Sequence, residues 1–298
     1  MIQSKLNVAS AEPVRRSESN LDKTGGTSMV LIKDDEFIEL VTFIKSNYGI
    51  NLFEKRTLVT GRLQQILAEK NLNSFSEYLK YIKSDQTGKA ISALVNRITT
   101  NHTFFMREKE HFNFFQVQVL TGLKTIVANK DLRIWSAGCS SGEEPYTLAM
   151  IIADFLGAER KLWDSRILAT DISEKVLEIA IRGIYPNEQL QVLPEEWRRK
   201  YFVKHDSDSS QVIDEIRENI IFRQFNLMNP VFPFKKKFQV IFCRNVMIYF
   251  DSETRRQLVN RFYEQTEPGG YLFIGLSESL RREETPYKYI RPSVYRKE

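Results

Sequence analysis

The chain has 298 residues, of which 42% are hydrophobic and 27% charged, and this composition is typical of a globular protein. No apolar run approaches the ~20 residues of a membrane span, and residues 1–20 contain no signal-peptide h-region, so a cytoplasmic protein without membrane insertion is expected. The net charge of +5 suits an acidic partner but does not establish nucleic-acid binding. The two cysteines and three histidines lack the spacing of metal ligands, so no metal is expected.

The first third of the chain has two parts. Residues 1–28 are rich in Ser, Asn, Gly and charge, which indicates a disordered tail or linker. Residues 29–100 are predicted to form an all-helical domain. Its first helix begins at Asp34, carries apolar residues at helical spacing and ends at Gly49; three more are expected within 53–71, 74–84 and 88–100.

From residue 132 onward short apolar strands alternate with helices. Strands are predicted within 132–137, 165–172, 238–246 and 269–279, with helices within 143–156, 173–184 and 252–266. This order predicts a mainly parallel sheet with helices on both faces. Residues 200–226, around the polar turn "DSDSS", interrupt the alternation and are interpreted as a small antiparallel β-subdomain.

The loop "SAGCSSGEEPY" (136–146) joins the first strand to a helix, where α/β proteins bind ligands. A triphosphate is disfavoured because Glu143 and Glu144 stand where a phosphate-binding lysine is needed. A dinucleotide is disfavoured because the loop lacks G-x-G-x-x-G. Asp171, at the end of the next strand, still suits ribose hydroxyls.

S-adenosylmethionine is the third candidate, since it is a nucleoside without phosphate that carries a sulfonium and an ammonium. Its positive charges would be attracted to carboxylates beside the loop. The alternative is that Glu143 and Glu144 only complement the dipole of the helix that they begin. The loop combined with Asp171 favours the methyl donor.

Five stretches resemble one family, the chemotaxis-receptor glutamate methyltransferases, CheR. They are "TTNHTFFMRE" (99–108), "WSAGCSSGEEPYTLA" (135–149), "LATDISEKVLEIAIRGIY" (168–185), "FNLMN" (225–229) and "FQVIFCRNVMIYFDSETRRQLVNRF" (238–262). The resemblance implies a Rossmann-like class I methyltransferase domain over 101–298, containing the β-subdomain, and a receptor-recognition role for the helical domain. It also implies methyl transfer from S-adenosylmethionine to glutamate carboxylates of transmembrane chemoreceptors, with S-adenosylhomocysteine as the second product, for sensory adaptation.

The resemblance also implies roles for particular residues. Glu144 corresponds to the carboxylate at the methionine end of the cofactor and Asp171 to the ribose-binding acid. Asn226 and Leu227 would flank adenine. The resemblance makes Arg107 a cofactor contact and places Tyr249 near the methyl group. From the chemistry of its planar guanidinium, Arg107 is also expected to orient the acceptor carboxylate, and Tyr249 would either hydrogen-bond that carboxylate or border the methyl group. The remaining cofactor contacts are Asn101, Thr103, Arg244 and Asn245.

Other features concern partners. Lys55 and Arg62, seven residues apart, are expected to share a helix face, with Arg56 adjacent. Either this face attracts an acidic receptor helix, as the family resemblance favours, or it is only a solvated helix surface. Leu276 stands in "GLSE" where the family often has histidine, so the site cannot depend on an imidazole there. The turn "DSDSS" lacks glycine, which leaves docking of a receptor C-terminal peptide on the β-subdomain open. A monomer is expected.

Two other functions compete with receptor methylation. A nucleic-acid methyltransferase would fit the charge, but the chain has "CRNVMIY" where amine methylation typically uses an N-P-P-Y-like motif. A module that binds S-adenosylmethionine without turnover is disfavoured by the intact motifs.

Overall fold

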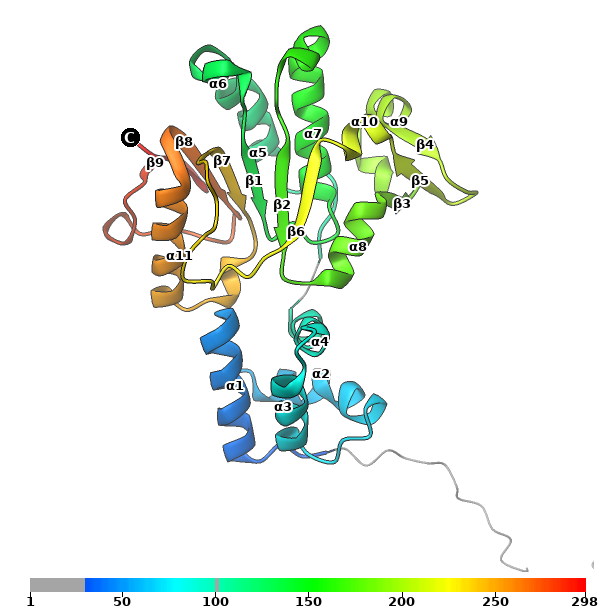
Figure 1. Ribbon diagram of the computed structural model, residues 1–298, viewed down its shortest axis with the longest axis vertical. Helices are drawn as coiled ribbons and strands as arrows, with labels where there is room; N and C mark the ends of the chain where they lie inside the picture. Colours follow the sequence, from blue (N-terminus) through cyan, green and yellow to red (C-terminus); the bar gives the residue numbers. More distant parts are fainter. Residues whose placement is uncertain (1–29, 100–101) are drawn as a thin grey trace, which may run out of the picture.

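The computed structural model describes residues 30–99 and 102–298, so the predicted tail (1–28) lies outside the described residues. A helical domain lies below an α/β domain in Figure 1. The helical domain consists of α1 (Asp34–Tyr48), α2 (Arg56–Glu69), α3 (Phe75–Ser84) and α4 (Lys89–Ile98). Ser74 caps α3 by accepting a hydrogen bond from the Glu77 amide, and Gly49 ends α1 with φ of 73°.

The main sheet has the strand order β6-β2-β1-β7-β8-β10-β9. Strands β6, β2, β1, β7 and β8 are parallel, whereas β10 pairs antiparallel with both β8 and β9. The first five strands follow the doubly wound order 3-2-1-4-5 when they are counted along the chain. The strand bounds are β1 (Ile134–Ala137), β2 (Ile167–Asp171), β6 (Ile220–Gln224), β7 (Phe238–Cys243), β8 (Thr266–Ile274), β9 (Lys288–Arg291) and β10 (Val294–Arg296).

Helices cover both faces of this sheet (Figure 1). The α-helices of this domain are α5 (Lys109–Phe114), α6 (Thr121–Ile126), α7 (Glu143–Leu156), α8 (Glu174–Arg182), α9 (Glu195–Tyr201), α10 (Asp214–Arg217) and α11 (Ser252–Gln265). A π-helical turn, η1 (Phe115–Leu120), joins α5 to α6. The short 3₁₀ helices are η2 (Ala128–Lys130), η3 (Gly157–Leu162), η4 (Gln189–Val192), η5 (Met247–Tyr249) and η6 (Arg282–Glu284).

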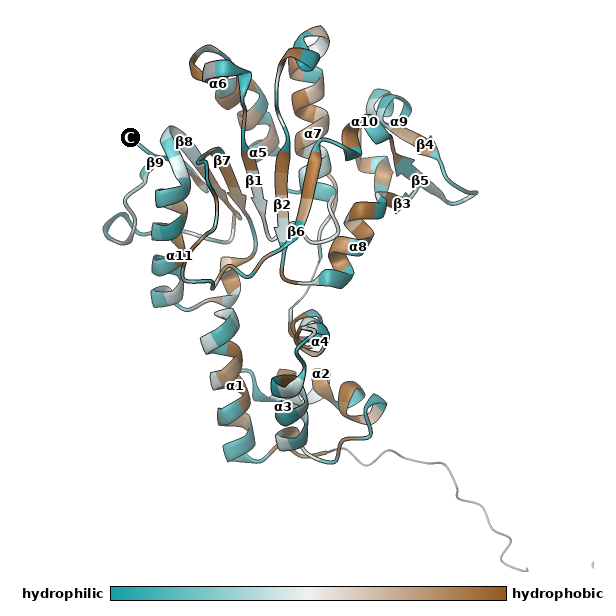
Figure 2. Ribbon diagram, viewed as in Figure 1, coloured by the Kyte–Doolittle hydropathy of each residue, from teal (hydrophilic) through white to brown (hydrophobic). Residues whose placement is uncertain are grey.

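Successive side chains of a strand point to opposite faces of the sheet, so the sheet has a hydrophobic core on each face. Side chains of β7 alternate between them: Val240 and Phe242 join the core under α7, whereas Ile241 and Cys243 join the core under α11. The parallel strands therefore have apolar side chains on both faces, as the brown stretches of β2 and β6 in Figure 2 show.

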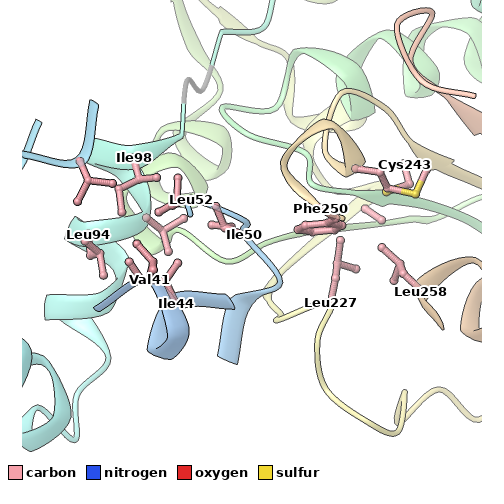
Figure 3. Packing of buried hydrophobic residues seen from close by; sticks show 14 of the residues in the cluster. Val41, Ile44, Ile50, Leu52, Leu94, Ile98, Leu227, Cys243, Phe250 and Leu258 are labelled. Atoms are coloured by element: carbon pink, nitrogen blue, oxygen red, sulfur yellow. The ribbon is translucent and has the colours of Figure 1, made fainter. Parts of the chain in front are cut away.

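The core under α11 continues into the helical domain. Ile50 and Leu52, which follow α1, belong to the same buried cluster as Leu227 and Phe250 (Figure 3). The Asn51 amide donates to the Tyr249 carbonyl at 2.8 Å, and the Lys45 ammonium lies 2.7 Å from the Asp251 carboxylate. Apolar packing and polar contacts thus join the two domains directly beneath the sheet.

The small antiparallel sheet differs from the prediction. It has the order β3-β5-β4, with β3 (Ile184–Pro186), β4 (Phe202–Lys204) and β5 (Ser209–Val212). The hairpin around "DSDSS" forms as expected, but placing residues 220–224 in this subdomain was wrong, because β6 pairs in parallel with β2 at the edge of the main sheet. The third strand comes instead from before the hairpin. Strand pairing is non-local, so a local apolar pattern does not reveal which sheet a strand joins.

Within residues 30–99 and 102–298, none of the helices has the length and apolar character needed to cross a bilayer.

Gly49 tests the junction between the domains. Its φ of 73° is left-handed, so Gly49→Ala should lower the free energy of unfolding by about 1–2 kcal/mol, measured by urea denaturation. Gly61→Ala is the matched control: Gly61 lies in α2 with no atom within 4 Å of an added Cβ, so the change should stabilise by about 0.5–1 kcal/mol. Equal effects of the two substitutions would contradict the left-handed conformation of Gly49.

Candidate functional site

A cavity of about 400 Å³ lies between the domains, at the carboxyl ends of β1, β2 and β7. This volume is in the range of small-molecule sites. Of the residues that the sequence predicted for the site, nine line this cavity: Thr103, Arg107, Glu144, Asp171, Asn226, Leu227, Arg244, Asn245 and Tyr249. Asn101 lies outside the described residues. The structure therefore brings residues from five separate stretches to one place.

The helical domain contributes lining residues that the sequence analysis missed: Tyr48, Ile50, Val95 and Thr99. No motif identified them, because they reach the cavity only through the packing of α1 and α4 against the α/β domain. Asn226 takes part in this junction, since its amide nitrogen donates to the Asn47 carbonyl at 2.8 Å.

The loop after β1 packs closely against the loop after β7. Gly138 has φ of 86°, and a Cβ there would lie 2.4 Å from a methyl carbon of Val246. Asp171 holds the same loop from the other side, because its carboxylate accepts from the Ser140 amide at 2.9 Å and from the Ser173 amide at 3.0 Å. Burial raises the pKa of Asp171, against the lowering effect of these amides.

The two glutamates of the loop have different surroundings. Glu143 is buried, accepts from the Ser141 hydroxyl at 2.8 Å, and does not line the cavity; burial raises its pKa. Glu144 lines the cavity and accepts from the Ser136 hydroxyl at 2.7 Å. The geometry thus separates a structural carboxylate from one that can meet a ligand.

Arg244 joins Glu144 to a second carboxylate, that of Glu108. The guanidinium lies 2.8 Å from Glu144 and 3.1 Å from Glu108, donates to the Arg107 carbonyl, and is 2% exposed in its side chain. Two carboxylates share one guanidinium, so the pair retains an excess of negative charge beside the cavity. That excess suits a cationic ligand and disfavours a phosphate.

Glu108 was missed by the sequence analysis, although it ends the quoted stretch "TTNHTFFMRE". Its second oxygen accepts from the Asn245 amide group and from the Leu276 backbone amide, both at 3.2 Å. Burial opposes its ionisation, but His111, Arg244 and these donors outweigh burial and hold the pKa of Glu108 at about 2. Glu108 therefore ties the interdomain segment to the loops after β7 and β8.

Arg107 and Tyr249, the residues expected at the acceptor, both line the cavity. The Arg107 guanidinium donates to the His102 carbonyl at 2.6 Å and lies 6.0 Å from the centre of the Phe104 ring. Tyr249 is half-buried in η5. Phe104 is an exposed lining residue, whereas Phe105 is fully buried.

Tyr185 connects the small sheet to the loop after β1. Its hydroxyl donates to the Ser141 carbonyl at 2.6 Å, and burial raises the pKa of this phenol well above its ordinary value, so it remains a donor. Its ring lies 4.9 Å from that of Phe105. The sequence analysis did not single out Tyr185, although this residue ends the stretch "LATDISEKVLEIAIRGIY" that resembles the family.

Neither cysteine has the surroundings of a nucleophile. Burial, with Asp171 adding to it, raises the pKa of the Cys139 thiol well above its ordinary value. Among the described residues, no group of three or more His, Cys, Asp or Glu side chains is arranged to hold a metal ion.

Comparisons with known proteins agree with this geometry. Residues 101–295 match the model of the CheR methyltransferase SAM-binding domain, and residues 35–99 match the CheR methyltransferase all-alpha domain. A chemotaxis protein methyltransferase of Borreliella burgdorferi is 41% identical over 270 residues, which cover 89% of this chain and 95% of that protein. The chemotaxis protein methyltransferase of Escherichia coli is 33% identical over 273 residues, covering 90% and 93%.

The sheet order and the match to a SAM-binding domain together define a Rossmann-like methyltransferase that uses S-adenosylmethionine. The chain belongs to the CheR family of chemotaxis protein methyltransferases, which confirms the resemblance found in its motifs.

The pH dependence of stability tests the role of Glu108. Its folded pKa lies below the ordinary value of 4.5, so its stabilising contribution is present above about pH 4.5 and is lost as the pH falls toward 2. Glu108→Gln should lower the free energy of unfolding by roughly 3 kcal/mol at pH 7, and this difference from the wild type should shrink toward pH 3 in urea titrations. Glu39→Gln, which removes a surface partner of Lys83, is the control. If the difference in free energy of unfolding between Glu108→Gln and the wild type stays constant with pH, the lowered pKa of Glu108 in the folded protein is contradicted.

The hydroxyl of Tyr185 is tested against that of Tyr146, which donates to the Ala180 carbonyl at 2.7 Å and does not contact the loop carbonyl. Tyr185→Phe should weaken S-adenosylhomocysteine binding ~5- to 10-fold by calorimetry, since the loop loses a positioning hydrogen bond. Tyr146→Phe loses a similar bond but should bind within about twofold of the wild type. Equal weakening in both variants would show a general loss of stability instead.

Proposed function

We propose that this protein transfers the methyl group of S-adenosylmethionine to glutamate side chains of chemoreceptors and forms glutamyl methyl esters. The observation that supports this most is that one cavity is lined both by the carboxylates of Glu144 and Asp171 and by Arg107 and Tyr249. The carboxylates offer negative charge for a cationic nucleoside, and the guanidinium and the phenol suit an acceptor carboxylate.

The carboxylates fit the cofactor chemically. Asp171 is held by two amides but keeps lone pairs that can accept from ribose hydroxyls. Glu144, oriented by Ser136 and Arg244, would attract the positive methionine end. Asn226 and Leu227 would flank the adenine; Thr103, Arg107, Arg244 and Asn245, together with Asn101, would complete the cofactor site.

Bound S-adenosylmethionine supplies an electrophilic methyl group. The acceptor glutamate, with a reference pKa of ~4.3, is already an anionic nucleophile at neutral pH, so the chain need not supply a general base. Arg107 would orient the acceptor carboxylate through its planar guanidinium, and Tyr249 would border or hydrogen-bond it. The remaining task is alignment, worth roughly 7–11 kcal/mol in favourable cases.

Receptor recognition by the helical domain, residues 29–100, remains part of the proposal. Its expected basic face is changed by the structure: Arg56 pairs with Asp34 at 2.5 Å, and Arg62 donates to the carbonyls of Arg97 and Ile98. Lys55, at the start of α2, keeps its exposed position. We further infer a cytoplasmic monomer whose partners do not include nucleic acid.

A labelled-methyl assay tests the proposed reaction. Incubation with labelled S-adenosylmethionine, a chemoreceptor signalling domain from the same organism and total RNA should label the receptor, and mild base should release the label as methanol. Base-stable label in protein would contradict glutamyl ester formation. Label in RNA would instead support the nucleic-acid alternative.

A further inference from the structure

Three exposed apolar side chains stand around the cavity on three different loops. Phe104 belongs to the interdomain segment, Ile248 to η5 and Leu276 to the loop after β8; they are 42%, 47% and 54% exposed. Phe104 and Ile248 also line the cavity. We call these three residues the apolar rim.

Two carboxylates, one buried and one mostly buried, hold the loops of the apolar rim together. Glu278 accepts from the Ile248 amide at 3.0 Å and from the Gly275 amide at 2.6 Å, so it joins the loop after β7 to the residue beside Leu276. Glu108 accepts from the Leu276 amide at 3.2 Å and is one residue from Arg107, whose guanidinium lies near the Phe104 ring. Hydrogen bonds to these two carboxylates therefore position the backbone that carries Ile248 and Leu276.

The exposure of the apolar rim is not explained by the fold. The amide of Leu276 is held by Glu108 and that of its neighbour Gly275 by Glu278, yet the Leu276 side chain is more than half exposed. Exposed apolar residues are common when scattered singly, but two that line one cavity and a third on a loop bound to the same carboxylates indicate an interaction surface.

We propose that the apolar rim is a docking surface for the acceptor protein, and that it contacts apolar side chains next to the glutamate that is methylated. This inference rests on the proposed function and adds the substrate class that the site selects. The occupant follows from continuity with the cavity: a glutamate side chain is short, so its own backbone and neighbouring side chains must lie against the opening when its carboxylate reaches Arg107. Arg107 would attract the carboxylate of the acceptor glutamate. The apolar rim would favour an acceptor segment in which apolar side chains flank that glutamate over a segment in which all the flanking side chains are polar.

Steady-state kinetics with a purified chemoreceptor cytoplasmic fragment from the same organism test the apolar rim. Leu276→Ser and Ile248→Ser should each raise the KM for the fragment ~10-fold, as expected when a central interface contact is truncated. For Leu276→Ser, S-adenosylhomocysteine affinity, measured by calorimetry, and the thermal midpoint should stay close to those of the wild type, because the Leu276 side chain is 54% exposed and is not among the residues that line the cavity.

Leu162→Ser is the matched control. Leu162 is 62% exposed and lies in η3, just before β2 begins, whereas the cavity is at the end where β2 finishes. Its KM for the fragment should not change. An unchanged KM in both rim variants, or an equal rise with Leu162→Ser, would overturn the inference. A wild-type enzyme that binds S-adenosylhomocysteine but does not methylate the fragment would overturn the proposed function instead.

Discussion

The contact on which the rest of the site depends is the buried guanidinium of Arg244 between the carboxylates of Glu108 and Glu144. It joins three parts of the chain that are far apart in sequence: the segment between the domains, the first turn of α7 and the loop after β7. A buried charge without a partner is costly, so none of these parts can move away without exposing or stranding a charge. The two carboxylates carry one negative charge more than Arg244 neutralises, which suits the cationic nucleoside proposed for the cavity.

The second constraint is the junction between the domains. Ile50 pairs with Phe250 as an isolated antiparallel bridge, and the Asn51 amide holds the carbonyl of Tyr249. The residue proposed to face the acceptor is thus attached to the helical domain through its own backbone. Because Tyr48, Val95 and Thr99 also line the cavity, the helical domain completes its wall.

Electrostatics and backbone geometry support one another in the loops after β7 and β8. Asn245 has φ of 59°, an unfavourable conformation for a residue with a side chain, and its amide is held by Glu278 while its side chain is held by Glu108. Gly275 leaves space for Asn245, since a Cβ there would lie 2.5 Å from the side-chain nitrogen of Asn245. These two loops carry Tyr249 and two residues of the apolar rim, Ile248 and Leu276.

The sequence by itself determined the succession of helices and strands, the position of the ligand loop and nine described residues of the cavity, because these depend on local periodicity, caps and motifs. Three things were decided only by tertiary structure. Residues 220–224 joined the main sheet, since strand partners are non-local. Glu143 and Glu144, adjacent in sequence, were separated into a buried carboxylate and a cavity carboxylate by the direction in which the first turn of α7 points each of them. Glu108, Glu278 and Tyr185 acquired their roles only when loops distant along the chain met, because a buried polar side chain is given its function by the partners that satisfy it.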